Sequence, residues 1–377
     1  MHFDTRSVHA AAIHDEHGSV ASPIILSTTF ERNPDGTFRD HLYSRYSNPN
    51  RTALEAAVAN LESGGDAGAR GYAFASGLAA SAALLQTLQS GDHVLLPDDV
   101  YHGVFAQVQE LFTPLGITFS RVDMSNSAAV ANAMRTETKI VWMETPSNPM
   151  LKITDIAAVA AIARDGSAIS VCDNTWATPV LQRPLALGCD VVLHSATKYI
   201  GGHSDVLQGV LAVRGGCDAL HEKLTRVQMV GGAVPSPFEC WLAARGLMTM
   251  PVRVRAQAAS AEQIALWLSE HPAVERVLYP GLATHPGYDI AKRQMSHAGA
   301  MLSFMVRGSG EKAMRTACST TIFTHATSLG AVESLIEHRA SVEGIGSTTP
   351  DTLLRLSIGL EHTADLIADL DRALAAK

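Results

Sequence analysis

Long apolar runs, basic clusters and paired cysteines are all scarce in this sequence. No apolar stretch approaches the ~18 residues that a membrane-spanning helix needs, and the N-terminus, Met1–Arg6, lacks the charged-then-apolar pattern of a signal peptide. Charged residues make up 18% of the 377 and sum to −8, with no run of lysine or arginine. Together these absences predict a cytoplasmic protein with no membrane or nucleic-acid partner.

The cysteines and histidines show no arrangement typical of disulfides or metal sites. The five cysteines are scattered, with no Cys-x-x-Cys spacing, as expected for reduced cysteines of a cytosolic protein. Cys172 and Cys189 lie in apolar runs, so burial explains them better than reactivity. Among the sixteen histidines, pairs such as His14 and His17 lack a recognised ligand spacing. The sequence therefore predicts no metal site.

The pattern of residue types changes twice along the chain. Residues 1–50 are rich in Ser, Thr, Asn, Pro and Gly with little periodicity, which predicts an extended arm that needs another surface, such as a second subunit, to lie on. Residues 51–237 alternate strand-like and helical patterns, which predicts an α/β domain with a mostly parallel sheet covered on both faces. Residues 238–377 predict a smaller C-terminal αβ domain.

Periodicity places the individual elements. Expected strands are 93–96, 117–122, 139–143, 168–172, 191–193, 206–213, 274–278, 301–306 and 353–357. Expected helices are 51–61, 76–88 with Ser76 as N-cap, 101–115, 155–164, a segment from near 238 that continues with 252–271, and a last helix from 363.

An amine, two hydroxyls and a carboxylate follow two of these expected strands. Asp173 closes the run from Ala168, and Ser195, Thr197 and Lys198 follow the run 191–193. Ligands of parallel sheets bind beyond such strand ends. Pyridoxal phosphate (PLP) needs an amine for a Schiff base, hydroxyls for its phosphate and a carboxylate facing its pyridine nitrogen. We therefore predict that Lys198 forms the Schiff base, Asp173 faces the ring nitrogen, and both hydroxyls bind phosphate.

Each of these residues also has an ordinary structural interpretation. A lysine is usually solvated, but Lys198 follows a buried strand, where desolvation would lower its pKa. Asp173 could simply cap a turn. Gly77 and Leu78, at an expected helix start, could offer backbone N–H groups to an anion, although this signal is weak alone. Tyr101 fits either core packing or a ring stacked on the cofactor.

The chain resembles the Cys/Met-metabolism family of PLP enzymes, the trans-sulfuration group, over nearly its whole length. This group includes cystathionine γ-lyase, cystathionine γ-synthase, cystathionine β-lyase and methionine γ-lyase. The resemblance rests on Tyr43-Ser-Arg45 with Asn48-Pro49, Ser76-Gly77-Leu78, Glu144-Thr-Pro-Ser-Asn148-Pro149, Asp173-Asn-Thr175, Ser195-Ala-Thr-Lys198, Gly231-Gly-Ala-Val-Pro-Ser-Pro237, Ser328-Leu-Gly330 with Glu333-Ser-Leu335, and Arg355-Leu-Ser-Ile-Gly-Leu-Glu361.

The resemblance implies PLP fold type I, the aspartate-aminotransferase-like arrangement, in a homotetramer built as a dimer of dimers. Tyr43 and Arg45 would reach the phosphate of the neighbouring subunit's cofactor. Arg355 would bind the substrate α-carboxylate through its bidentate guanidinium, and Ser328 and Asn148 would assist that arginine or orient the cofactor. Of the other matching positions, Tyr101 would stack on the cofactor and move protons, and Gly77, Leu78 and Thr175 complete the cofactor-binding set.

The resemblance also implies a reaction, a carbon–sulfur elimination on cystathionine or a related thioether that gives a 2-oxo acid, ammonia and a thiol. Cystathionine γ-synthase, methionine γ-lyase and an aminotransferase on the same fold remain alternatives. A scaffold without activity is disfavoured because nucleophile, electron sink and carboxylate clamp occur together. Departures from the family pattern at His102, Val104, Thr327, Leu329 and Ala331 lie outside the cofactor set and leave substrate choice open.

Overall fold

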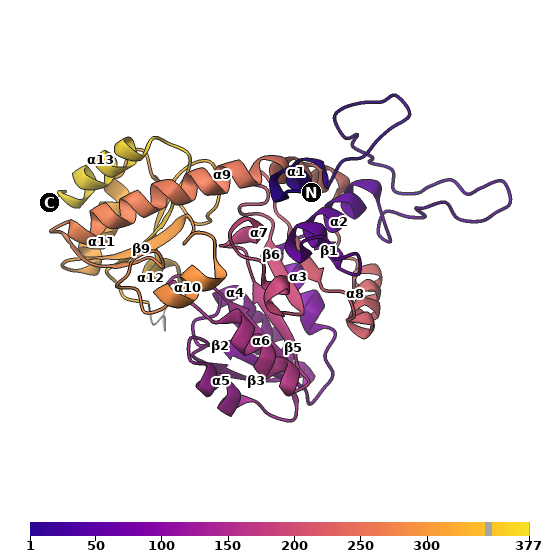
Figure 1. Cartoon of the computed structure of the whole chain (residues 1–377), viewed down its shortest axis with the longest axis horizontal. Coiled ribbons are helices and arrows are strands. Elements are labelled where there is room, and N and C mark those ends of the chain that lie inside the picture. Colours follow the sequence, from indigo (N-terminus) through magenta and orange to yellow (C-terminus); the bar gives the residue numbers. More distant parts are fainter. Residues whose placement is uncertain (344–348, 377) are drawn as a thin grey trace.

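The computed structural model describes residues 1–343 and 349–376, which form two β-sheets with the long helix α9 (Pro237–Glu270) running from one to the other (Figure 1). The larger sheet has the order β1-β7-β6-β5-β4-β2-β3. Its strands are β1 (Arg70–Phe74), β2 (His93–Pro97), β3 (Thr118–Val122), β4 (Thr138–Glu144), β5 (Ile169–Asp173), β6 (Val191–Ser195) and β7 (Gly209–Val213).

The expected α/β architecture with a mostly parallel sheet is confirmed. Strands β2 to β6 pair in parallel, and only β7 runs antiparallel to its neighbours β6 and β1. Apart from the edge strand β3, the strands are largely buried on both faces, with alternate residues packing into separate apolar clusters. Burial of both faces explains why these strands read as continuous apolar runs.

The helices of this part cover both faces of the sheet. α3 (Gly77–Leu85) and α8 (Asp218–Gly231) pack on one face, and α5 (Ser127–Ala133) and α6 (Ile156–Asp165) pack on the other, together with α2 (Pro49–Ser63). α7 (Thr178–Leu181) is short. The side chain of Ser76 accepts from Ala79 N, so the expected N-cap of α3 is confirmed.

Some predicted elements differ from the structure for local reasons. The helix expected over 101–115 consists of α4 (His102–Ala106), a π-helix (Gln107–Phe112) and a 3₁₀ turn (Thr113–Leu115). In contrast, the helical segment expected from near 238 that continues with 252–271 is confirmed as one helix, α9, which begins at a capping box formed by Ser236 and Glu239. β1 was missed because its Gly71 weakens the strand pattern. A Cβ there would lie 2.1 Å from Glu55 O, so glycine is needed for α2 to pack.

The second sheet has the order β10-β11-β12-β9-β8. The expected strands β8 (Val274–Leu278), β9 (Met301–Val306) and β12 (Leu353–Ser357) are confirmed, whereas β10 (Thr324–His325) and β11 (Leu335–His338) were not anticipated. The helices here are α10 (Tyr288–Gln294), α11 (Gly310–Ser319), α12 (Arg339–Glu343) and α13 (Thr363–Leu374). The division of the chain at 237/238 into two domains remains a prediction.

The N-terminal segment is irregular except for α1 (Phe3–His9), which was not expected. This helix is too short for a periodic signal, and it forms because it packs on α9, where Ser7 Oγ donates to Leu247 O at 2.5 Å. Residues 10–48 then leave the body as two long projecting loops (Figure 1). Large apolar side chains lie exposed on them, including Val20, Leu26 and Phe38.

The described residues contain neither a helix that could cross a membrane nor a cluster that could hold a metal ion. In 1–343 and 349–376, no helix combines the length and hydropathy needed to cross a bilayer. The same residues contain no cluster of three or more His, Cys, Asp or Glu side chains that could hold a metal ion.

Candidate active site

A cavity of about 740 Å³ lies at the carboxyl ends of β4, β5 and β6, and residues around β12 also line it. Every site residue predicted from the sequence lines this cavity except Tyr43 and Arg45. The structure thus brings together Gly77, Leu78, Tyr101, Asn148, Asp173, Thr175, Ser195, Thr197, Lys198, Ser328 and Arg355.

The backbone around Lys198 is tightly fixed. Lys198 N donates to Ser195 O at 3.0 Å, and Gly202 N donates to Lys198 O at 2.7 Å, so the chain turns sharply after β6. Helix α9 crosses this turn at Gly246, where a Cβ would lie 2.2 Å from Ile200 O. The helix therefore clamps the turn, and the position of the lysine follows from it.

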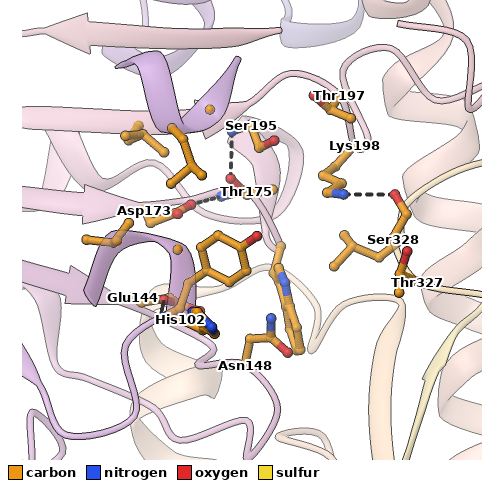
Figure 2. Close-up of a pocket in the computed structure, with 18 of the residues that line it drawn as sticks. His102, Glu144, Asn148, Asp173, Thr175, Ser195, Thr197, Lys198, Thr327 and Ser328 are labelled. Carbon is orange, nitrogen blue, oxygen red and sulfur yellow. Dashed lines mark hydrogen bonds between the residues drawn. The ribbon is translucent and has the colours of Figure 1, made fainter. Parts of the chain in front are cut away.

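The amine of Lys198 lies in the cavity next to Ser328. Its Nζ donates to Ser328 Oγ at 2.8 Å, as Figure 2 shows. Burial is the larger cause and the nearby positive charge of Arg355 the smaller one of a lowered pKa of Lys198, which is about 8. The negative charge of Glu337 opposes the shift. A large share of the amine is thus uncharged at mildly alkaline pH and able to act as a nucleophile.

Asp173 ends β5 and is tied to the neighbouring strand through Thr175. Thr175 N donates to Asp173 Oδ1 at 3.0 Å, and Ser195 N donates to Thr175 Oγ1 at 2.9 Å (Figure 2). Burial raises the pKa of Asp173, although the bonds from Thr175 oppose that shift. A carboxyl in this position is ionised most easily when a positively charged group or a hydrogen-bond donor lies next to it.

Glu144 lies beside Asp173 in register on β4. It accepts a hydrogen bond from Tyr101 N at 2.8 Å, which holds the start of α4 at the cavity. Burial and the adjacent carboxylate of Asp173 raise the pKa of Glu144 well above its usual range. Of this pair, Glu144 therefore holds a proton more readily and has a structural contact to Tyr101.

The start of α3 forms a narrow concave surface against β6. A Cβ on Gly77 would lie 3.0 Å from both Cβ and Oγ of Ser195, so glycine keeps this space open. Backbone N–H groups at a helix start and a serine hydroxyl make a suitable donor set for a phosphate. Thr197 Oγ1 donates to Gln208 O at 3.2 Å and accepts from Gln208 N at 2.9 Å, which fixes this hydroxyl nearby on the same turn.

Arg355 on β12 is a buried cation held by three partners. Nη1 donates to Asn148 Oδ1 at 2.9 Å, Nη2 donates to Ser328 O at 2.9 Å, and Nη2 also pairs with Glu337 at 2.5 Å. Burial lowers the pKa of Arg355 to about 10, so it stays charged at neutral pH. A guanidinium fixed in this way is well suited to bind a carboxylate.

Ser328 connects the two cations of the site. Its hydroxyl accepts from Lys198 and its carbonyl oxygen accepts from Arg355. Its φ is 84°, in the left-handed region that non-glycine residues rarely adopt. Strained residues of this kind persist where the surrounding structure over-determines them, commonly in active sites.

Two interpretations from the sequence concern Tyr101, which could pack in the core or stack on the cofactor, and Tyr43 and Arg45 of the N-terminal segment. Tyr101 lines the cavity and is 41% exposed, which does not fit core packing. Tyr43 and Arg45 lie outside their own chain's cavity. Tyr43 is exposed, and Arg45 Nη1 donates to Met229 O at 2.6 Å. Their predicted contact with a neighbouring cofactor remains a prediction.

Sequence reasoning missed part of the cavity wall, formed by Arg339, Val342 and Glu343 of α12. Their neighbour Glu337 is buried and pairs with both Arg355 and Arg339. The spacing of Arg339 and Glu343, four residues apart, was the one available signal, because it suits an ion pair on a helix.

The donor groups fit PLP, because they supply an amine, a carboxyl at a strand end and an anion-binding helix start around one cavity. The chain also matches the family model described as Cys/Met metabolism PLP-dependent enzyme over residues 4–375. The chain belongs to this family. PLP is therefore its cofactor, and its substrate belongs to the small-molecule amino acids. The expected PLP enzyme of sulfur amino-acid metabolism is confirmed.

Individual members of the Cys/Met-metabolism family are similar over almost their full length. A cystathionine beta-lyase of Coxiella burnetii is 43% identical, covering 99% of this chain and 98% of that protein. A cystathionine gamma-synthase of Mycobacterium tuberculosis is 44% identical, covering 98% and 96%. The crystal structure of metB from Corynebacterium glutamicum superposes with a TM-score of 0.95 at 43% identity, covering 99% and 98% of the two chains.

A second solved structure, cystathionine gamma-lyase from Lactobacillus plantarum complexed with L-serine, has a TM-score of 0.92 at 39% identity. It covers 100% of this chain and 99% of the other. These neighbours confirm the expected fold type I arrangement. Relatives with three different activities are about equally similar, so overall similarity does not select among them.

Proposed function

We propose that this enzyme is a carbon–sulfur lyase that acts on cystathionine or a closely related thioether. One observation carries the proposal. An amine with a lowered pKa, a buried carboxyl and a buried guanidinium line one cavity, although they come from the turn after β6, the end of β5 and β12. These are the groups that a PLP enzyme needs to labilise a proton next to an amino acid's carboxylate.

The residues divide the work by position. Arg355, steadied by Asn148 and Ser328, would bind the substrate α-carboxylate. PLP, when bound, supplies an electron-withdrawing ring that takes up the electron pair left at Cα. Asp173 would share a proton with the ring nitrogen. The uncharged amine of Lys198 would take the Cα proton and hold it at Nζ, where Ser328 Oγ already accepts a hydrogen bond.

Elimination at Cβ and at Cγ differ in what Lys198 must do. For a sulfur on Cβ, removal of the Cα proton is sufficient before the thiolate leaves. For a sulfur on Cγ, a second proton must leave Cβ, so the amine must reach two neighbouring carbons. Tyr101 lines the same cavity and could assist with that proton. Small differences in proton placement therefore decide between the two outcomes.

Cystathionine γ-synthase is the second candidate, because relatives with that name are as similar as the lyases. Its reaction joins an acylhomoserine to cysteine, which uses the same Cα and Cβ proton transfers. Methionine γ-lyase and an aminotransferase are weaker alternatives. The aminotransferase would pass the amino group to 2-oxoglutarate without releasing ammonia.

Product analysis separates these candidates. Purified enzyme with PLP is given cystathionine, methionine or S-ethylcysteine, and 2-oxo acid, ammonia and thiol are measured. In a second set it is given acylhomoserine with and without cysteine. A lyase releases 2-oxo acid and ammonia fastest from cystathionine. The proposal is contradicted if cystathionine is inert while acylhomoserine and cysteine give cystathionine.

We further propose that the active form is a homotetramer with shared active sites. Tyr43 and Arg45 lie outside their own cavity, and the loops that carry them expose large apolar side chains. Both features favour a second subunit as the surface on which the arm lies. A cytoplasmic location remains a prediction from the sequence.

A further inference from the structure

The cavity contains a second pair of opposite charges beyond Arg355. Arg339 and Glu343 lie one turn apart on α12, and both line the cavity. Arg339 Nη2 donates to Glu343 Oε1 at 2.9 Å. The proton-transfer scheme above uses neither residue. The exposed fractions of the two side chains are only 8% and 16%, so the pair is almost fully removed from solvent.

This pair is directly connected to the proposed α-carboxylate site. Arg339 Nη1 donates to Glu337 Oε2 at 2.9 Å, and Arg355 Nη2 pairs with the same oxygen at 2.5 Å. The two guanidinium groups are therefore separated by a single carboxylate oxygen. The Arg339–Glu343 pair lines the same cavity as Arg355, so a substrate held there by its α-carboxylate shares the cavity with this second pair.

We infer that Arg339 and Glu343 bind a second, zwitterionic amino-acid head group, remote from the carbon that reacts. The inference rests on the proposed function. The carboxylate of that head group would pair with Arg339 and its ammonium with Glu343, whose Oε2 already accepts from Thr349 Oγ1 at 2.7 Å. Each charge of the protein pair then faces an opposite charge of the head group. Binding therefore leaves the net charge of this wall unchanged and adds no unpaired charge.

The inference names a substrate class. Cystathionine carries a complete amino-acid head group on each side of its sulfur, and free cysteine, the partner in γ-replacement, is itself such a head group. Ethionine and S-ethylcysteine have the same Cγ–S or Cβ–S bond but end in an ethyl group. The α12 pair thus selects thioethers with two amino-acid ends, whichever bond is cleaved.

The test compares kcat/KM for cystathionine with kcat/KM for ethionine and S-ethylcysteine. R339Q and E343Q each lower the ratio of cystathionine to ethyl thioether by about 10- to 100-fold, the usual effect of losing a charge-assisted hydrogen bond. The loss falls mainly on KM. R339K keeps the positive charge but loses the paired N–H donors of the guanidinium, so its ratio lies between those of the wild type and R339Q. The control is S341A, which alters the same helix at an exposed residue that does not line the cavity and leaves the ratio unchanged.

The ratio is the deciding quantity because Arg339 also contacts Glu337, which pairs with Arg355. Replacing Arg339 therefore weakens the binding of every substrate to some extent. The double variant R339Q/E343Q keeps the net charge and should lower the ratio by less than the product of the two single effects. If all variants lower kcat/KM equally for cystathionine and for the ethyl thioethers, the pair only holds Arg355 in place and the inference is wrong.

A binding measurement separates this inference from the proposed function. Calorimetry on K198A measures cystathionine affinity without turnover. R339Q added to that background weakens the affinity about 10-fold or more if the head group binds there. An unchanged affinity overturns the inference. A wild-type enzyme that releases no 2-oxo acid from any thioether overturns the proposed lyase and leaves this binding result standing.

Discussion

At the scale of single residues, Lys198 combines reactivity with a cost to stability. Its pKa is lowered to about 8 in the folded chain from 10.5, so folding disfavours the charged amine. The unfavourable contribution is fully present below pH 8 and disappears as the pH rises from 8 to 10.5. The cause is burial beside Arg355, which also makes the amine a better nucleophile.

K198M should therefore stabilise the cofactor-free protein. Methionine keeps the length of the side chain without the charge, and we expect a gain of about 1–3 kcal/mol in the free energy of unfolding at pH 7. The gain shrinks towards pH 10.5. Urea unfolding at pH 7 and pH 10, at one protein concentration, measures it. K152M is the control and should destabilise, because Lys152 Nζ pairs with Asp98 at 2.8 Å. A destabilised K198M at pH 7 would contradict the account.

Asp173 and Glu144 are adjacent carboxyls with different predicted roles. D173N removes the group that would share a proton with the cofactor ring, so kcat should fall by about 100-fold or more while PLP still attaches. E144Q keeps an oxygen that can accept from Tyr101 N and should lose far less. Steady-state kinetics with the visible spectrum of bound PLP checks both. Equal losses in the two variants would remove the distinction between them.

At the scale of elements, strand ends and helix starts create the site. The register brings Phe74, Gly209 and Ser195 into line across β1, β7 and β6. The start of α3 consequently lies over the end of β6. The concave surface there depends on the missing side chain of Gly77. Its proposed role is to receive the cofactor's phosphate at a helix start.

G77A should fill this space and weaken binding of PLP by about 10-fold or more, because its Cβ would lie 3.0 Å from Ser195. Binding of pyridoxal, which has no phosphate, should change much less. Equilibrium titration of cofactor-free protein measures both. G231A is a suitable control, since its Cβ would meet nothing closer than 3.7 Å. Equal weakening for PLP and pyridoxal would show that the phosphate lies elsewhere.

The sequence predicted the elements that carry chemistry better than those that close the cavity. Asp173, Ser195 and Lys198 follow buried parallel strands, whose long apolar runs are easy to recognise. β11 and α12 are short, and their charged residues Glu337, Arg339 and Glu343 lie next to Arg355 of β12, which pairs with Glu337. The spacing of Arg339 and Glu343 suits a helical ion pair, but no local pattern shows that this pair lies at the cavity. The roles of Arg355 and Ser328 came from resemblance, and only the fold shows that they meet.

At the scale of the whole molecule, the site joins distant parts of one chain and, in our proposal, of two. Lys198 and Ser328 come from opposite halves of the sequence and are joined by a hydrogen bond. Tyr43 and Arg45 belong to the irregular segment 10–48 and do not line their own chain's cavity. In our proposal, these two residues of a neighbouring subunit complete each site.

Subunit mixing tests whether sites are shared. K198A and R45A are each expected to have little activity. After unfolding and refolding together in equal amounts, a mixed dimer contains one site with both residues intact, so about a quarter of the wild-type activity should return. K198A mixed with D173N is the control and should not recover, because both residues line the same chain's cavity. No recovery with R45A would place that residue within its own subunit's site or outside the chemistry.

The most direct test of the account is to locate the covalent attachment of PLP. The enzyme with its cofactor is reduced with borohydride, digested and sequenced by mass spectrometry. The account predicts the phosphopyridoxyl group on Lys198 alone, and none in K198A. Attachment to another lysine, or to none in an active enzyme, would contradict the assignment from which every other role was inferred.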